Sequence, residues 1–232
     1  MRRVALVALA LLATLGFVAL GIWQVERRAW KLDLIARVDA RVHAPPTAPP
    51  PPAAWPRLDS RAEEYRHVRL TGRFDNARET LTQAVTERGA GYWVLTPLRT
   101  ADGTVLVNRG FVPSDRRAPQ ARAAGQMGGV VTVVGLLRAS EPYGGFLRAN
   151  DPAGDRWHSR DVAAIARARG LGTVAPFFVD ADAAPNPGGY PIGGLTVIAF
   201  RNSHLVYAIT WFALAALSAA AAVVALRMPA RR

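Results

Sequence analysis

Apolar residues gather in two uninterrupted runs, one near each end of the chain. Neither residues 4–22 nor residues 205–226 include a charged side chain. A helix of about 20 apolar residues spans the hydrocarbon core of a bilayer. The first run is longer than the apolar core of a cleaved signal peptide, and its end offers no good small-x-small cleavage site. We therefore predict a transmembrane helix within residues 1–23, a second one over residues 204–226, and a basic tail at 227–232.

Small residues predict that the two helices pair. The second run is rich in Ala and includes Ser218, and the first run offers Ala13 and Gly16. Small side chains allow helices in lipid to approach closely. We therefore expect Ala13 and Gly16 to receive the Ala-rich part of the second helix.

Arginines beside the two runs predict their orientation. Two precede the first run and three follow the second: Arg2, Arg3, Arg227, Arg231 and Arg232. Cations favour the cytoplasmic side of a membrane, so both termini are predicted to be cytoplasmic. Cations after the first run (Arg27, Arg28 and Lys31) argue the other way, but a long connection crosses the membrane largely regardless of its charge. The region between the runs is therefore predicted to be extracytoplasmic.

The pattern changes twice between the two runs. Trp30, Leu34, Val38 and Val42 recur every four residues, which predicts a membrane-proximal amphipathic helix over residues 24–44. Seven prolines then fall between residues 45 and 56. Proline disfavours helix and central strand, so residues 45–57 are predicted to form an extended, semi-rigid linker.

Alternating apolar and polar positions dominate the remaining region, residues 58–203. Period-two alternation is typical of half-buried strands. The predicted strands are 65–74, 79–85, 92–98, 104–108, 130–137, 177–180 and 195–201. One helix interrupts them, capped by Ser159, with Asp161 in its first turn and Gly170 at its end. The predicted fold is thus a membrane protein in which two transmembrane helices flank a mainly antiparallel β domain of α+β class, either a barrel or a sandwich.

Charge and composition exclude several classes of function. The net charge of +12 suggests an anionic partner such as nucleic acid. However, all but one of the 29 Lys and Arg residues are Arg, and Ala is abundant. This bias indicates GC-rich codons, and we expect no nucleic-acid partner. The absence of Cys excludes disulfides, thiolate zinc sites and iron–sulfur clusters.

Sequence motifs for catalysis are missing as well. The patterns G-x-S-x-G, H-E-x-x-H and Walker A do not occur. Carboxylates that could form acid/base pairs, such as Asp180 and Asp182, are predicted to be solvated surface charges. We therefore expect no catalytic residues and no enzyme activity.

One polar cluster lies where the second apolar run begins. His204, Tyr207 and Trp211 are spaced i, i+3 and i+7 and share one helical stripe. In one interpretation Asn202 or Ser203 caps the helix and the rings lie in the headgroup layer. In the other, the imidazole of His204 ligates iron and the neighbouring rings hold a porphyrin. The spacing alone leaves both open.

Several motifs in order resemble a known family. Residues 21–31 read G-I-W-Q-V-E-R-R-A-W-K, similar to the G-x-W-Q-x-x-R-x-x-W-K segment of the surfeit locus protein 1 family. The similarity continues at Tyr65 and Gly72, at 91–97 (GYWVLTP), at 107–113 (VNRGFVP), at 188–191 (GGYP) and at 202–211 (NSHLVYAITW). The resemblance therefore covers nearly the whole chain.

The resemblance implies an assembly factor of heme-copper cytochrome c oxidase in the bacterial inner membrane. It implies that heme a is a transient cargo, with His204 as the axial ligand of its iron and Tyr207 and Trp211 beside it. The implied partners are the catalytic subunit of the oxidase and heme a synthase. Structural or docking roles are expected at Trp23, Gln24, Arg27, Trp30, Asn108, Arg109 and Gly110. The alternative is a membrane-anchored scaffold that binds no heme.

Overall fold

The computed structural model describes residues 2–142, 144, 148–198, 200 and 202–227. These residues form two compact units. The first comprises Met1–Asp39 with Ile198–Arg232, and the second comprises Ala40–Val197. All but the first residue of the predicted basic tail, 227–232, lies outside the described residues.

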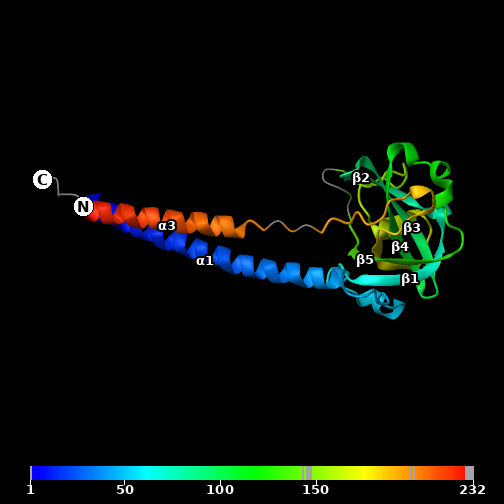
Figure 1. The fold of residues 1–232 in the computed structure, drawn as a ribbon, viewed down its shortest axis with the longest axis horizontal. Helices are drawn as coiled ribbons and strands as arrows, with labels where there is room; N and C mark the ends of the chain where they lie inside the picture. Colours follow the sequence, from blue (N-terminus) through cyan, green and yellow to red (C-terminus); the bar gives the residue numbers. More distant parts are fainter. Residues whose placement is uncertain (1, 143, 145–147, 199, 201, 228–232) are drawn as a thin grey trace. The chain divides into compact units, whose positions relative to one another are not determined.

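Two long helices form the first unit. Helix α1 covers Arg2–Val42 without a break, and α3 covers His204–Arg227. Both are long and apolar enough to cross a membrane, judged by length and composition. They lie side by side and run in opposite directions (Figure 1). Ala10 of α1 contacts Ser218 of α3, whereas Gln24, farther along α1, contacts His204 at the start of α3.

A seven-residue repeat governs how these helices meet. On α3 the buried residues are Ala208, Ala215 and Ala222, spaced by seven. The inter-helix contacts follow the same interval: Gln24 with His204, Phe17 with Trp211, and Ala10 with Ser218. Seven residues forward on α1 thus match seven residues back on α3. This is the interval of a left-handed helix pair. Small residues along the line of contact between α1 and α3, the helix seam, allow the helices to approach closely.

The close approach on α1 occurs at Gly21. A Cβ atom at Gly21 would lie 2.6 Å from a ring carbon of Phe212, whereas one at Gly16 would meet nothing within 4 Å. The prediction that Gly16 receives the second helix is therefore wrong, since Gly16 is exposed. Ala13 is half-buried.

The second unit is a closed β sheet. Its strands are β1 (His67–Phe74), β2 (Thr80–Thr86), β3 (Gly89–Thr100), β4 (Gly103–Pro113), β5 (Val130–Ala139) and β6 (Val174–Ala181). The order is β1-β5-β6-β4-β3-β2, and an additional pairing of β1 with β3 closes the sheet. All pairs are antiparallel except β4 with β6. The sequence leaves open a barrel or a sandwich, and the structure is a barrel.

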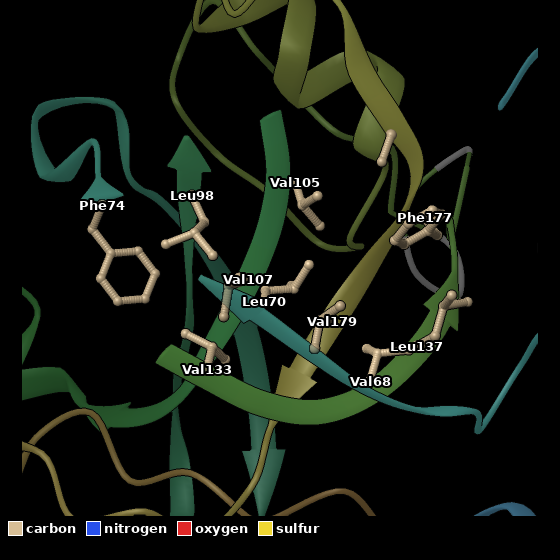
Figure 2. Close-up of a cluster of buried hydrophobic side chains, with 11 residues drawn as sticks. Val68, Leu70, Phe74, Leu98, Val105, Val107, Val133, Leu137, Phe177 and Val179 are labelled. Atoms are coloured by element: carbon tan, nitrogen blue, oxygen red, sulfur yellow. The ribbon is translucent and has the colours of Figure 1, made fainter. Parts of the chain in front are cut away.

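Side chains from β1, β3, β4, β5 and β6 fill the barrel (Figure 2). The alternation in the sequence explains which ones point inward, since Val105 and Val107 join this core while Leu106 joins a second cluster. That second cluster includes Trp157 and Phe178 and packs against helix α2 (Val162–Ala168). Short 3-10 turns complete the unit: Pro52–Arg57, Asn76–Arg78, Ser114–Arg116, Pro119–Gly125 and Pro187–Gly189.

Three local predictions need correction. Residues 195–198 and 200 form no strand, and 199 and 201 lie outside the described residues; the pairing of β1 with β3 already closes the barrel. The cap of α2 is Asp161, whose carboxylate accepts from the Ala164 amide, and Ser159 instead bonds Asn150. The strand predicted to end at Asn108 continues to Pro113.

The Pro tract packs on the barrel. Thr47 bridges to Val68 in parallel fashion, with hydrogen bonds to the backbone of His67 and Arg69. The Trp55 ring packs against the core and meets Phe177 edge-on at 6.5 Å between ring centroids. These contacts anchor the tract to the barrel.

Candidate functional site

His204 is the first residue of α3 and bonds to α1. Its Nδ1 lies 2.7 Å from Oε1 of Gln24, and Gln24 is only 8% exposed although it is polar. Both residues lie just beyond the apolar runs, so the pair sits where both runs end. A buried amide needs a partner, and the imidazole provides one.

This hydrogen bond decides which imidazole nitrogen is available. A carbonyl oxygen can only accept, so Nδ1 of His204 carries the hydrogen and donates it to Gln24. In the neutral ring, Nε2 then keeps its lone pair. A hydrogen bond of this kind fixes the tautomer and ring orientation of histidines that ligate metals. His204 therefore offers one nitrogen, Nε2, whose chemistry suits a ligand of heme iron.

The other two members of the predicted stripe lie in different surroundings. Trp211 is half-buried and stacks on Phe17 at 5.7 Å between ring centroids, so it belongs to the helix seam. Tyr207 is 53% exposed. His204 and Trp211 thus share the seam face of α3, while Tyr207 lies beside it.

The G-x-W-Q motif has two faces. Gly21 and Gln24 are buried toward α3. Trp23 and Trp30 are 52% and 46% exposed, and the guanidinium of Arg27 lies 4.0 Å from the centroid of the Trp30 ring. Sequence reasoning places Gln24 among the docking residues and misses its contact with His204. The shared seven-residue spacing of the two helices is the signal that could have paired them.

The motif Asn108-Arg109-Gly110 lies in the barrel unit. Asn108 donates to Asp180 at 2.7 Å and accepts from the Gly110 amide at 3.2 Å. Gly110 has φ +128°, and Phe111 forms an antiparallel bridge with Ile192 beside it. In its structural context, this motif joins β4 to the segment around Ile192.

Asp180 is buried, contrary to the expectation of a surface charge. It is 3% exposed and accepts from Arg138 at 2.9 Å, from Arg160 at 3.0 Å and from Thr196 at 3.1 Å. Such a carboxylate is compensated by its partners. The signal in the sequence is its place at the end of an apolar strand.

The barrel histidine His67 offers no comparable site. Both of its ring nitrogens are engaged, Nδ1 with the Ala44 carbonyl and Nε2 with Asp182, each at 2.8 Å. Within the described part of the chain, no group of three or more His, Asp or Glu residues could hold a metal ion.

Comparisons with known proteins match one family over most of the chain. The SURF1 family matches residues 11–216. Surfeit locus protein 1 of Homo sapiens is 38% identical over 215 residues, which cover 85% of this chain and 69% of the human protein. A SURF1-like protein of Monosiga brevicollis is 38% identical over 87% of this chain and 80% of its own length. The relative from Drosophila melanogaster, also named SURF1-like, is 34% identical over 85% of this chain and 69% of its own length. With a match of this extent, the chain belongs to the SURF1 family.

Proposed function

We propose that the protein is a membrane-embedded assembly factor of heme-copper cytochrome c oxidase that carries heme a and has no catalytic activity of its own. In this proposal α1 and α3 span the bacterial inner membrane, both termini are cytoplasmic, and the barrel is periplasmic. Heme a synthase supplies the heme, and the catalytic subunit of the oxidase receives it.

The observation that carries the proposal is the hydrogen bond between Gln24 and His204. It supports a metal-ligating role because the lone pair of the neutral ring then lies on Nε2 of His204, which makes no hydrogen bond among the described residues. The pair lies at the ends of two apolar runs, and an ionisable residue at such a place is a functional candidate. A carrier whose ligand lies at the membrane surface would spare an apolar porphyrin the passage through water.

The chemistry of the donor set also suits a carrier. His204 would supply one ligand to the iron of a bound heme, and a single ligand allows release more readily than two. Gln24 would hold the imidazole plane. Tyr207 offers exposed aromatic surface beside the ligand. None of these residues is asked to perform bond-making or bond-breaking on the heme.

The test is the absorption spectrum of the full-length protein, purified from cells that synthesise heme a. We expect a Soret band in stoichiometric amount, which His204→Ala removes while the protein still inserts and folds. His67→Ala is the control, since both nitrogens of His67 are already engaged. If His204→Ala retains the band and the control loses it, the heme site is in the barrel and the assignment is wrong.

A second pair of variants tests the role of Gln24. Gln24→Ala should weaken heme binding about 10- to 100-fold, the usual effect of removing a partner of a metal ligand. Gln24→Glu keeps an acceptor oxygen and should restore binding. If both variants bind heme as tightly as the wild type, Gln24 serves only the helix seam.

The scaffold alternative makes the opposite prediction. A scaffold would show no stoichiometric heme at all, and His204→Ala would leave oxidase maturation unchanged. Mature oxidase should fall in His204→Ala cells under the carrier proposal, without vanishing, because some heme can reach its site unassisted.

A further inference from the structure

Among the described residues of the barrel unit, four arginine side chains are largely or fully withdrawn from solvent, and three of these have carboxylate partners. Arg122 pairs with Glu79, Arg138 with Asp180, and Arg160 with both Asp180 and Glu141. The fourth, Arg109, is 2% exposed. Within the described residues it forms no ion pair, and Glu79, whose charge acts on it, is already bound by Arg122.

The contacts of Arg109 leave its buried Nη1 without a partner among the described residues. Nη2 donates to the Gly125 carbonyl at 2.6 Å and to Oδ1 of Asn186 at 3.2 Å. The guanidinium lies 4.6 Å from the centroid of the Phe74 ring. Nη1 is buried and has no hydrogen-bond partner among the residues that the structure describes. Burial lowers the pKa of Arg109 to about 10, so the group is still a cation at neutral pH.

Arg109 forms part of the wall of a cavity of about 300 Å³. The cavity lies between β4, β5 and the segment 181–186. Most of its lining is apolar, as at Phe74, Val107, Met127 and Val133. The carboxylate in its described wall, Asp182, is bound by His67 at 2.8 Å. The cavity therefore combines an apolar wall with a cation that lacks a counter-charge among the described residues.

We propose that this cavity binds a small carboxylate with an apolar body, and that Arg109 is the group that recognises its charge. A buried charge without a partner is costly, so an anion that reaches Nη1 gains a charge-assisted hydrogen bond and relieves that cost. The apolar wall favours a hydrocarbon or aromatic body attached to the carboxylate. The inference goes beyond the proposed heme role, since every residue involved belongs to the barrel unit.

The test compares two probes of the same shape on the full-length protein in lipid nanodiscs. 3-Phenylpropionate carries the charge, and 3-phenylpropionamide does not. Isothermal titration calorimetry should find one saturable site for the acid, and the amide should bind roughly tenfold more weakly or worse, the loss expected for a hydrogen bond to a charged group. Equal binding of acid and amide, or no saturable binding of the acid, would overturn the proposal.

Variants locate the site. Arg109→Gln should abolish the preference for the acid, while Arg88→Gln, at an exposed turn, should keep it. Because Arg109→Gln can also disturb the fold, Ala184→Trp provides a second route: Ala184 lines the cavity and is exposed, so a large side chain there should block binding and leave the unfolding midpoint unchanged. If Ala184→Trp binds the acid as the wild type does, the acid binds elsewhere and the proposal fails.

Discussion

Gly110 presents two separate obstacles to a side chain. Its φ of +128° is one that L residues rarely adopt, and a Cβ there would lie 2.1 Å from the carbonyl oxygen of Ile192. That oxygen accepts from the Phe111 amide at 2.8 Å, and the Ile192 amide donates back to Phe111 at 2.9 Å. A methyl group at residue 110 therefore forces this bridge apart.

The cost can be estimated from these parts. The backbone conformation costs about 1–3 kcal/mol for a non-glycine residue. Each hydrogen bond of the bridge contributes about 1 kcal/mol, and more if its buried partner is left without one. We expect Gly110→Ala to lose about 4 kcal/mol of unfolding free energy, which is much of the stability of a typical domain. Gly110→Val should be worse and should lower the protein level, while heme ligation by the remaining folded protein is unchanged.

Two matched glycines separate the causes. Gly89 has φ +96° and open space, with nothing within 4 Å of the position that a methyl group would take. Gly128 has an ordinary φ and equally open space. Gly89→Ala should show the conformational cost alone, and Gly128→Ala should show neither cost.

The assay is urea unfolding of the full-length protein, followed by tryptophan fluorescence. Trp55, Trp93 and Trp157 report on the barrel unit. If Gly110→Ala loses no more stability than Gly89→Ala, the reasoning from the Ile192 contact is refuted. A stable variant that fails in oxidase maturation would instead make the motif a docking surface.

Three further predictions concern topology, pH and the helix seam. Reporter fusions at the C-terminus and within residues 45–56 should report opposite sides of the membrane, and cytoplasmic signals from both would contradict the two-span arrangement. Burial lowers the pKa of His67, but the hydrogen bonds and charge of its partners, chiefly Asp182, outweigh burial and the net pKa is raised. The pair of His67 and Asp182 therefore stabilises the fold fully below about pH 6.5, and this stabilisation is lost as pH rises through the pKa of the folded state. His67→Gln should make the free energy of unfolding less dependent on pH between about pH 5.5 and 8.5. Gly21→Leu should separate the helices, seen as lost disulfide formation between cysteines introduced at 10 and 218, whereas Gly16→Leu, which meets open space, should not.

Sequence patterns predict those elements whose signal is local. The two apolar runs, six of the seven proposed strands and the turn after α2 at Gly170 follow from periodicity and turn residues. The structure contains each of them, although the strand proposed at 104–108 extends to Pro113. The strand proposed at 195–201 is wrong over its described residues because alternation shows amphipathic spacing without showing whether a neighbouring strand has a free edge. Strand closure is a property of the whole sheet.

The candidate site shows the same limit. The motifs single out both His204 and Gln24, but their contact joins positions 180 residues apart. Likewise the burial of Asp180 and Arg109 depends on which strands lie together, since either side chain alone is typical of a surface. Long-range pairing of polar groups has no local signature.

The seven-residue repeat along the contact of α1 and α3 bears on how the two helices align with each other. Shifting α3 by one repeat along α1 would again bring small residues opposite the seam, since Ala208, Ala215 and Ala222 are equivalent in size and spacing. The polar contacts are not equivalent: Gln24 would face Trp211 in place of His204, or would lie beyond the helix end, and its amide would lose its partner. The alanine repeat by itself would thus permit several alignments of the two helices. The contacts of Gln24 with His204, Phe17 with Trp211 and Gly21 with Phe212 select one of them.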